Sequence, residues 1–290
     1  MSRYKIVLFL SFLLSHGLYA KYLNFGRADA NKTIQEYKNF NETFNSAYIG
    51  IPKGVLGIAE PFYGTYSEAL QKIPNLKNYT KKLPAVVYMQ GYKSFKLGNK
   101  IRKWVTEAGY LFFAPNSYSS KDRPTYNIMA PHNFLEKIHQ YNLAEIDLFI
   151  KRLDELSFID RDRMFLVGFS EGGVAVSRYS GVEFVGRIVL GWSCEANFFT
   201  QYPQIGAKAD DPFLNVIGRD DELFGSQSPL NRGYRVTGNC ADALFKFTNA
   251  KVVVLPNTTH NLLKSPFIKD EILNFIDIYR DIKSDKKSKK

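Results

Sequence analysis

The sequence has few of the residues and patterns that define several specialised classes of protein. Its 290 residues include only two Cys, too few for a disulfide-dense scaffold or a four-thiolate zinc site. Pro and Gly occur 12 and 20 times, near ordinary usage, which excludes collagen-like and linker-dominated architectures. We find no repeat at solenoid periods and no dinucleotide- or phosphate-binding loop. The sequence therefore points away from fibrous, repeat and nucleotide-binding proteins.

Apolar and aromatic residues are abundant instead. Hydrophobic residues make up 45% of the chain and aromatic residues 15%, with 23 Phe and 18 Tyr, which is ample for a large core and excludes a disordered chain. The net charge of +11 is partly terminal, because residues 1–20 carry +2 and residues 281–290 carry +3, leaving +6 for residues 21–280. Such a moderately basic body with a basic tail is not a concentrated phosphate-binding stripe, so we expect no nucleic-acid partner.

The first twenty residues have the pattern of a secretory signal peptide. Arg3 and Lys5 precede an apolar stretch from Ile6 to Leu14, and Ala20 is a small residue at the expected cleavage site. The stretch is about half of the ~20 residues that a membrane-spanning helix needs. We therefore predict a secreted or periplasmic protein with no integral membrane segment once the signal is removed.

Four segments are expected along the chain: a signal peptide (1–20), an irregular N-terminal segment (21–45), one α/β domain (46–280) and a basic C-terminal tail (281–290). Within the domain, short apolar runs alternate with amphipathic segments, which predicts a mostly parallel central sheet with helices on both faces. Strands are expected at 48–52, 85–89, 110–114, 164–167, 184–191, 213–217 and 252–255, and helices over 97–108 and 134–156, from 171 and from 265.

The strongest local signal is the segment from Gly168 to Gly173, which reads GFSEGG. A bare G-x-S-x-G is a weak pattern, but here it directly follows a predicted strand and directly precedes a predicted helix, as a nucleophile elbow requires. Small residues on both sides of the serine allow strand and helix to approach closely. We therefore predict Ser170 as a nucleophile; the alternative is a glycine-rich turn without catalysis.

A serine hydroxyl needs a base to become a good nucleophile. Of the four histidines, only His260 follows Ser170 in the chain, and it lies in the loop after the strand KVVVL. In folds that use a nucleophile elbow, the catalytic residues follow one another along the chain in the order serine, acid, histidine. The acid that orients the imidazole should follow the intervening strand, and there we predict Asp221, with Asp220 as the alternative.

An acyl-transfer site also needs two converging backbone N–H groups to bind an oxyanion. One is expected from Glu171, directly after the nucleophile at the positive end of a helix, with its side chain pointing away from the site. The other is expected from Tyr92, in the loop after the strand at 85–89.

With these residues in place, the chain resembles the dienelactone hydrolase-like family of the α/β-hydrolase superfamily, as an exported member with a serine nucleophile. Met89-Gln90-Gly91 is similar to the family's oxyanion loop, although Gln90 stands where a His is usual, and Ser170 replaces the cysteine of the founding enzymes. The resemblance implies the α/β-hydrolase fold and the triad Ser170, Asp221 and His260. It covers roughly residues 84–280.

Cys194 and Cys240 resemble a cysteine pair in exported relatives. In an oxidising compartment they could form a disulfide, which would stabilise the fold by about 4 kcal/mol on the chain-entropy model. The alternative is two separate buried thiols.

The sequence favours a serine hydrolase that cleaves carboxylic esters through an acyl-enzyme, on a small-molecule or glycan ester. Two alternatives remain: a peptidase of the same fold, and a catalytically silent hydrolase-fold protein that binds a component of the cell envelope. We expect no cofactor, no metal and a monomer.

Overall fold

The computed structural model describes residues 40–282, which build an eight-stranded sheet flanked by helices. The strands are β1 (Tyr48–Ile51), β2 (Phe62–Thr65), β3 (Leu83–Met89), β4 (Leu111–Ala114), β5 (Ile159–Phe169), β6 (Gly186–Leu190), β7 (Phe213–Gly218) and β8 (Ala250–Leu255). The α-helices are α3 (Phe40–Asn45), α4 (Tyr66–Lys72), α5 (Lys96–Glu107), α6 (His132–Asp154), α7 (Glu171–Arg178) and α8 (Ile268–Tyr279).

The sheet order is β2-β1-β4-β3-β5-β6-β7-β8. All neighbours from β4 to β8 run parallel, whereas β1 pairs antiparallel with both β2 and β4. The expected mostly parallel sheet is confirmed, and this architecture is the α/β-hydrolase fold. Parallel strands all end at the same edge, so the loops that follow β3, β5, β7 and β8 meet at one end of the molecule.

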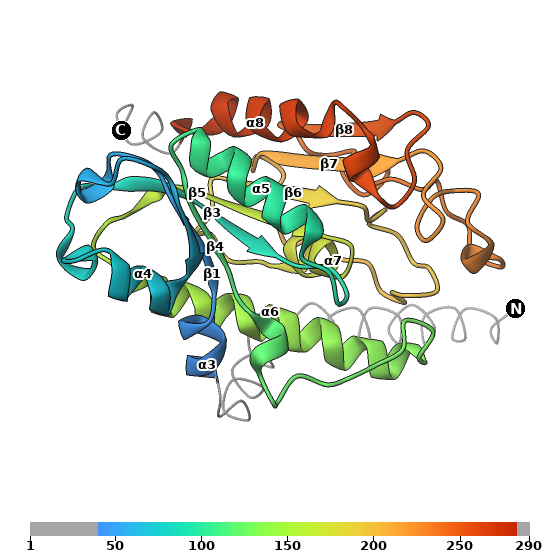
Figure 1. Ribbon diagram of the computed structural model, residues 1–290. Coiled ribbons are helices and arrows are strands. Elements are labelled where there is room, and N and C mark those ends of the chain that lie inside the picture. The colour runs from blue at the N-terminus through green and yellow to red at the C-terminus, as the bar shows by residue number, and fades with distance from the viewer. Residues whose placement is uncertain (1–39, 283–290) are drawn as a thin grey trace, which may run out of the picture.

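Helices cover both faces of the sheet, as Figure 1 shows, with α5 and α8 on one face and α3, α4, α6 and α7 on the other. Each face has its own apolar core. Side chains of α5 and α8 such as Ile101 and Phe275 pack with one set of strand residues, and those of α6 and α7 such as Phe149 and Val174 pack with the other. The central strands are therefore buried on both sides, which explains their continuous apolar sequence.

The structure differs from the sequence-based expectations near its N-terminal edge. Residues 40–45, expected to be irregular, form α3, and β2 and α4 were not predicted. The strand predicted at 48–52 is present as β1, and it lies between β2 and β4. Strand β2 is short and only partly buried, so it lacks the apolar run that would have identified it.

The predicted signal peptide (1–20) and residues 283–290 of the predicted tail lie outside the described residues, and the division of the chain into four segments stays a prediction. Across residues 40–282, none of the helices combines the length and the apolar character that crossing a bilayer requires.

A buried histidine lies on the inner side of α6. His139 is 1% exposed, its Nε2 is 3.1 Å from the carbonyl oxygen of Phe199, and its ring packs edge-on against the ring of Phe199 at 5.0 Å. Burial, followed by the positive charge of Arg178, lowers the pKa of His139 to about 3. The imidazole is therefore neutral in the folded protein near pH 7.

This burial predicts acid-sensitive stability. Between pH 6.5 and about 3 the unfolded chain binds a proton at His139 that the folded chain does not, so the free energy of unfolding falls as the pH is lowered, by up to about 1.4 kcal/mol per pH unit. In urea titrations from pH 7 to pH 4, we expect His139→Gln to flatten that slope by about 1 kcal/mol per unit. The matched control is the same pair of proteins between pH 7 and pH 8, where residue 139 binds no proton in either state and the two slopes should coincide. An unchanged slope in His139→Gln would contradict the prediction.

Candidate active site

The turn between β5 and α7 holds Ser170 in a strained backbone conformation. Its φ and ψ are 56° and −117°, a region that residues with a side chain rarely adopt and that is found at functional turns. The Ser170 N–H donates to the carbonyl oxygen of Leu190, 2.8 Å away in β6. The turn is thus tied to the neighbouring strand, and the predicted strand–turn–helix context of Ser170 is present.

Two glycines allow the backbone to pass this closely. A Cβ atom at Gly168 would lie 2.2 Å from the carbonyl oxygen of Gly172, and one at Gly172 would lie 2.1 Å from the carbonyl oxygen of Met89. Neither distance is physically accessible, and both contacts are with backbone. Glycine is therefore required at 168 and 172 for α7 to start against the ends of β5 and β3.

The structure brings Ser170, His260 and Asp221 together. The Ser170 Oγ lies 3.0 Å from His260 Nε2, and His260 Nδ1 lies 2.8 Å from Asp221 Oδ2. Asp221 and His260 are 39 positions apart in the sequence, and Ser170 and His260 are 90 positions apart. The chain of contacts has the order in which an imidazole can take a proton from a hydroxyl while a carboxylate holds its other nitrogen.

Asp221 is fixed from two sides. Its Oδ1 accepts hydrogen bonds from the backbone N–H groups of Leu223 and Phe224, both at 2.9 Å, and its side chain is fully buried. The alternative, Asp220, faces Arg219 Nε at 3.4 Å and its side chain is half exposed. Of the two aspartates, only Asp221 contacts the imidazole in the described structure.

The loops that carry the carboxylate and the imidazole are joined to each other. The Asp220 N–H donates to the Thr258 carbonyl at 2.9 Å, and Glu222 Oε2 accepts from the His260 N–H at 2.9 Å. The imidazole packs against the rings of Phe169 and Phe224, with centroids 4.9 and 5.6 Å away. These contacts restrict the ring to an orientation that faces Ser170.

The two residues expected to supply oxyanion donors, Tyr92 and Glu171, both line the cavity at Ser170. Glu171 is the first residue of α7, where backbone N–H groups have no partner within the helix. Tyr92 follows β3 and lines the same cavity as Ser170 and Glu171. The Glu171 side chain, expected to point away from the site, is 1% exposed and bound by Arg123 and Asn142 in the interior.

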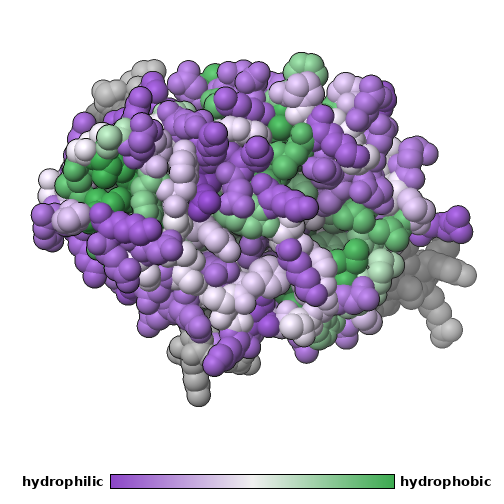
Figure 2. All heavy atoms as spheres, in the orientation of Figure 1, coloured by the Kyte–Doolittle hydropathy of each residue, from purple (hydrophilic) through white to green (hydrophobic). Residues whose placement is uncertain are grey.

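A cavity of about 400 Å³ lies over Ser170 and His260. Much of its lining is apolar and includes Phe169, Phe198, Phe199, Leu223, Phe224 and Leu262. Figure 2 shows apolar side chains within a largely hydrophilic surface, at the end of the molecule toward which the parallel strands run. A cavity of this size and chemistry is suited to a small molecule with an apolar part.

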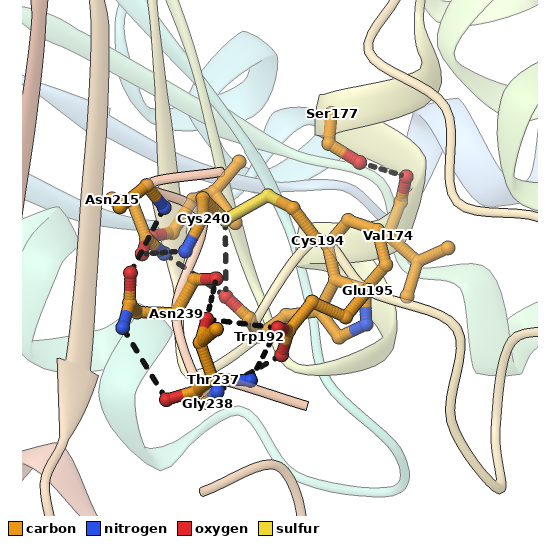
Figure 3. The surroundings of a disulfide bond; sticks show 12 residues. Val174, Ser177, Trp192, Cys194, Glu195, Asn215, Thr237, Gly238, Asn239 and Cys240 are labelled. Atoms are coloured by element: carbon orange, nitrogen blue, oxygen red, sulfur yellow. Dashed lines mark hydrogen bonds between the residues drawn. A yellow bond between two sulfur atoms is a disulfide. The ribbon is translucent and has the colours of Figure 1, made fainter. Parts of the chain in front are cut away.

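A disulfide joins Cys194 and Cys240, and Figure 3 shows its surroundings. It joins the turn after β6 to the segment that follows the Asp221 loop. Asn215 in β7 supports both sides, because its amide donates to the Trp192 carbonyl at 2.9 Å and accepts from the Cys240 N–H at 3.0 Å. The alternative of two separate thiols is thereby excluded for this structure.

Similarity to known proteins was found among solved structures. No protein-family model matches the chain, and no curated protein sequence does. Similar solved structures include the esterase PE8 (18% identity, TM-score 0.46, covering 71% of this chain and 96% of that one) and Est1E from Butyrivibrio proteoclasticus (17%, 0.44, 80% and 94%). A protein assigned as a dienelactone hydrolase from Klebsiella pneumoniae subsp. pneumoniae is also similar (18%, 0.49, 70% and 90%). The fold is assigned from the sheet order and from the turn at Ser170, not from these similarities.

Sequence reasoning missed the interior partners of Glu171. Arg123 and Asn142 come from a loop and a helix with no motif of their own. The one available signal was the acidic residue directly after Ser170, since a carboxylate at a buried helix start needs a cation or several donors.

The close approach at Gly172 predicts a position-specific effect on stability. Gly172→Ala forces α7 away from β3 and should lower the free energy of unfolding by about 1–3 kcal/mol. Gly173→Ala is the matched control, because a Cβ there would meet its nearest neighbours at 3.3–3.4 Å and should cost less than about 1 kcal/mol. Urea denaturation followed by circular dichroism measures both. Equal effects of the two substitutions would show that the contact at Gly172 is not the constraint.

The disulfide predicts redox-dependent stability. It closes a loop with a sequence separation of 46, so its removal in Cys194→Ala/Cys240→Ala should lower the free energy of unfolding by about 4 kcal/mol. Wild-type protein should show a similar loss after reduction, whereas the double variant should not respond to reductant. A wild-type midpoint that is insensitive to reductant would contradict the prediction.

Proposed function

We propose that this protein is a serine hydrolase that cleaves carboxylic esters through an acyl-enzyme. The observation that carries the proposal is the contact chain from Ser170 Oγ through His260 to Asp221, at 3.0 and 2.8 Å, on a strained turn beneath an apolar cavity. A binding protein has no need for a hydroxyl, an imidazole and a carboxylate in this order, so the arrangement favours an enzyme over a catalytically silent relative.

In the first half of the proposed reaction, Ser170 Oγ attacks the ester carbonyl carbon while its proton passes to His260 Nε2. Asp221 holds the imidazole through Nδ1 and stabilises the imidazolium that forms. The carbonyl oxygen becomes an oxyanion that accepts hydrogen bonds from the Tyr92 and Glu171 N–H groups. The C–O bond to the alcohol then breaks, the alcohol oxygen takes the proton from His260, and the acyl group stays on Ser170.

In the second half, water replaces the alcohol. His260 takes a proton from the water as its oxygen attacks the acyl carbon, and the second oxyanion occupies the same donors. Collapse of this intermediate breaks the bond to Ser170 Oγ, which regains its proton from His260, and the carboxylic acid leaves. Atoms and charge balance without any cofactor.

The cavity supports esters with a compact apolar or aromatic part. Phe198 and Phe224 stack with centroids 5.6 Å apart and an interplanar angle of 20°, and Phe199 completes this aromatic wall. The substrate class within carboxylic esters, and membership of the dienelactone hydrolase-like family, are parts of the same proposal. Hydrolysis of peptides instead of esters would favour the peptidase alternative.

We also propose that the protein is exported. The Cys194–Cys240 disulfide supports this, since disulfides persist in oxidising compartments, and the predicted signal at residues 1–20 supports it independently.

The proposed roles predict the effects of single substitutions. Wild-type protein should react with a fluorophosphonate probe and hydrolyse p-nitrophenyl butyrate, and Ser170→Ala should abolish labelling and lower kcat by at least about 10³-fold. Asp221→Asn, which leaves the imidazole in the wrong tautomer, should lower kcat by about 10³–10⁴-fold.

Asp220→Asn is the matched control and should retain kcat within about twofold, because that side chain faces solvent and Arg219. A folded wild-type protein that neither reacts with the probe nor hydrolyses esters would overturn the proposal and favour a binding role. A larger effect at 220 than at 221 would overturn the assignment of the acid.

A further inference from the structure

The side chain of Glu171 is the centre of a buried polar cluster behind the nucleophile. Its Oε1 accepts hydrogen bonds from Arg123 Nη2 and, at 2.7 Å, from Asn142 Nδ2, and its Oε2 accepts from the hydroxyl of Tyr126. Arg123 Nη1 also donates to Asn142 Oδ1 at 3.0 Å. We call Arg123, Tyr126, Asn142 and Glu171 the Glu171 network.

The loop that carries Arg123 and Tyr126 also contacts Tyr92, the residue expected to supply the other oxyanion donor. The Tyr126 carbonyl oxygen accepts a hydrogen bond from the Tyr92 hydroxyl at 2.8 Å, and the Tyr92 and Tyr126 rings pack with centroids 4.8 Å apart. The Tyr118 hydroxyl accepts from the Lys93 N–H at 2.7 Å. Lys93 has a φ of 49°, so this hydrogen bond supports a backbone conformation that is uncommon for a residue with a side chain.

From these contacts we infer that Tyr126 and Arg123 are positioning residues that set the two halves of the oxyanion hole relative to each other. Tyr126 joins the two turns directly: its hydroxyl holds Glu171, and its backbone carbonyl holds Tyr92. The inference rests on the proposed function. It assigns a catalytic purpose to the segment between β4 and α6, which carries none of the reacting groups.

Arg123 also has an electrostatic role, because it forms an ion pair with Glu171. A carboxylate on the residue whose N–H binds the oxyanion would oppose the negative charge that develops there, most strongly in a buried site. Arg123 neutralises it, and the pair is nearly fully buried, with side chains 5% and 1% exposed. Burial lowers the pKa of Arg123, but the Glu171 and Glu145 carboxylates outweigh this and raise the pKa overall. The guanidinium therefore stays charged.

The hydroxyl of Tyr126 also keeps the proton that it donates to Glu171. Burial, followed by the negative charge of Glu171, raises the pKa of its phenol, so the hydroxyl keeps its proton. The Arg123 guanidinium is in turn held over the Tyr118 ring, 4.4 Å from its centroid. The guanidinium of Arg123 and the phenol of Tyr126 therefore both keep their protons and remain donors to Glu171.

The experiment separates positioning of the oxyanion donors from general damage. Wild type, Tyr126→Phe, Arg123→Gln and Arg123→Lys are compared for kcat and KM on p-nitrophenyl butyrate and for the Ki of phenyl trifluoromethyl ketone. Ser170 adds to this ketone to give a hemiketal oxyanion, so its Ki reports on the oxyanion donors. Tyr88→Phe is the matched control, because it also removes a buried tyrosine hydroxyl, one that has no hydrogen-bond partner in the described structure.

We expect Tyr126→Phe to lower kcat about tenfold, raise the Ki of the ketone by about the same factor, and leave KM within twofold. Arg123→Gln should lower kcat by about 30-fold or more, and Arg123→Lys, which restores the charge but not the two-pronged geometry, should recover part of that loss. Tyr88→Phe should leave all three constants within twofold. If Arg123→Gln does not fold, the kcat and Ki of Tyr126→Phe alone test the inference.

Two outcomes overturn the inference while the proposed function stands: Tyr126→Phe with wild-type kcat and Ki, or a fall in its kcat with an unchanged Ki, in an enzyme that Ser170→Ala inactivates. If the wild-type protein hydrolyses no ester and binds no ketone, the proposed function fails and the inference fails with it.

Discussion

The close contact between the start of α7 and the ends of β3 and β5 is the constraint on which the site depends. It exists because neither Gly168 nor Gly172 has a side chain, which lets backbone meet backbone where a Cβ would lie about 2 Å from a carbonyl oxygen. This contact raises Ser170 above the sheet and brings the turn after β3 next to it. The Asp221 carboxylate and the His260 imidazole lie on the turns after β7 and β8, which hydrogen-bond to each other. Both turns meet the fixed turn at Ser170, which His260 contacts directly.

The sequence alone was sufficient for the parts of the molecule that are determined locally. The parallel sheet could be predicted because its strands are short apolar runs. Ser170, Asp221 and His260 could be selected because they lie one, three and five residues after the ends of β5, β7 and β8. The segments that were missed, β2 and α4, are partly exposed and lack a strong apolar pattern. The Glu171 network could not be predicted, because Arg123, Tyr126 and Asn142 lie 48, 45 and 29 positions from Glu171 and no spacing rule joins them.

The buried ion pair between Arg123 and Glu171 is better explained by geometry than by stability. Removing two charges from water carries a penalty that their attraction often only balances, whereas the loss of one partner leaves a buried charge uncompensated. Such a pair fixes orientation: both Glu171 oxygens are used, and the guanidinium divides its donors between Glu171 and Asn142. A second buried arginine, Arg187, likewise binds Asp211 and the Gly181 carbonyl at the far end of β6, where it anchors a loop remote from Ser170.

The backbone at Ser170 has a consequence for how this sequence can change. A residue held in a rarely populated φ/ψ region carries a conformational penalty of about 1–3 kcal/mol, and the surrounding contacts must compensate for it. Selection for thermal tolerance alone would favour relaxing that turn, whereas selection for the proposed hydrolase activity would retain it. Under the proposed function, the turn at Ser170 is therefore a compromise between stability and reactivity. The rigid elements around residue 170 compensate for its conformational penalty.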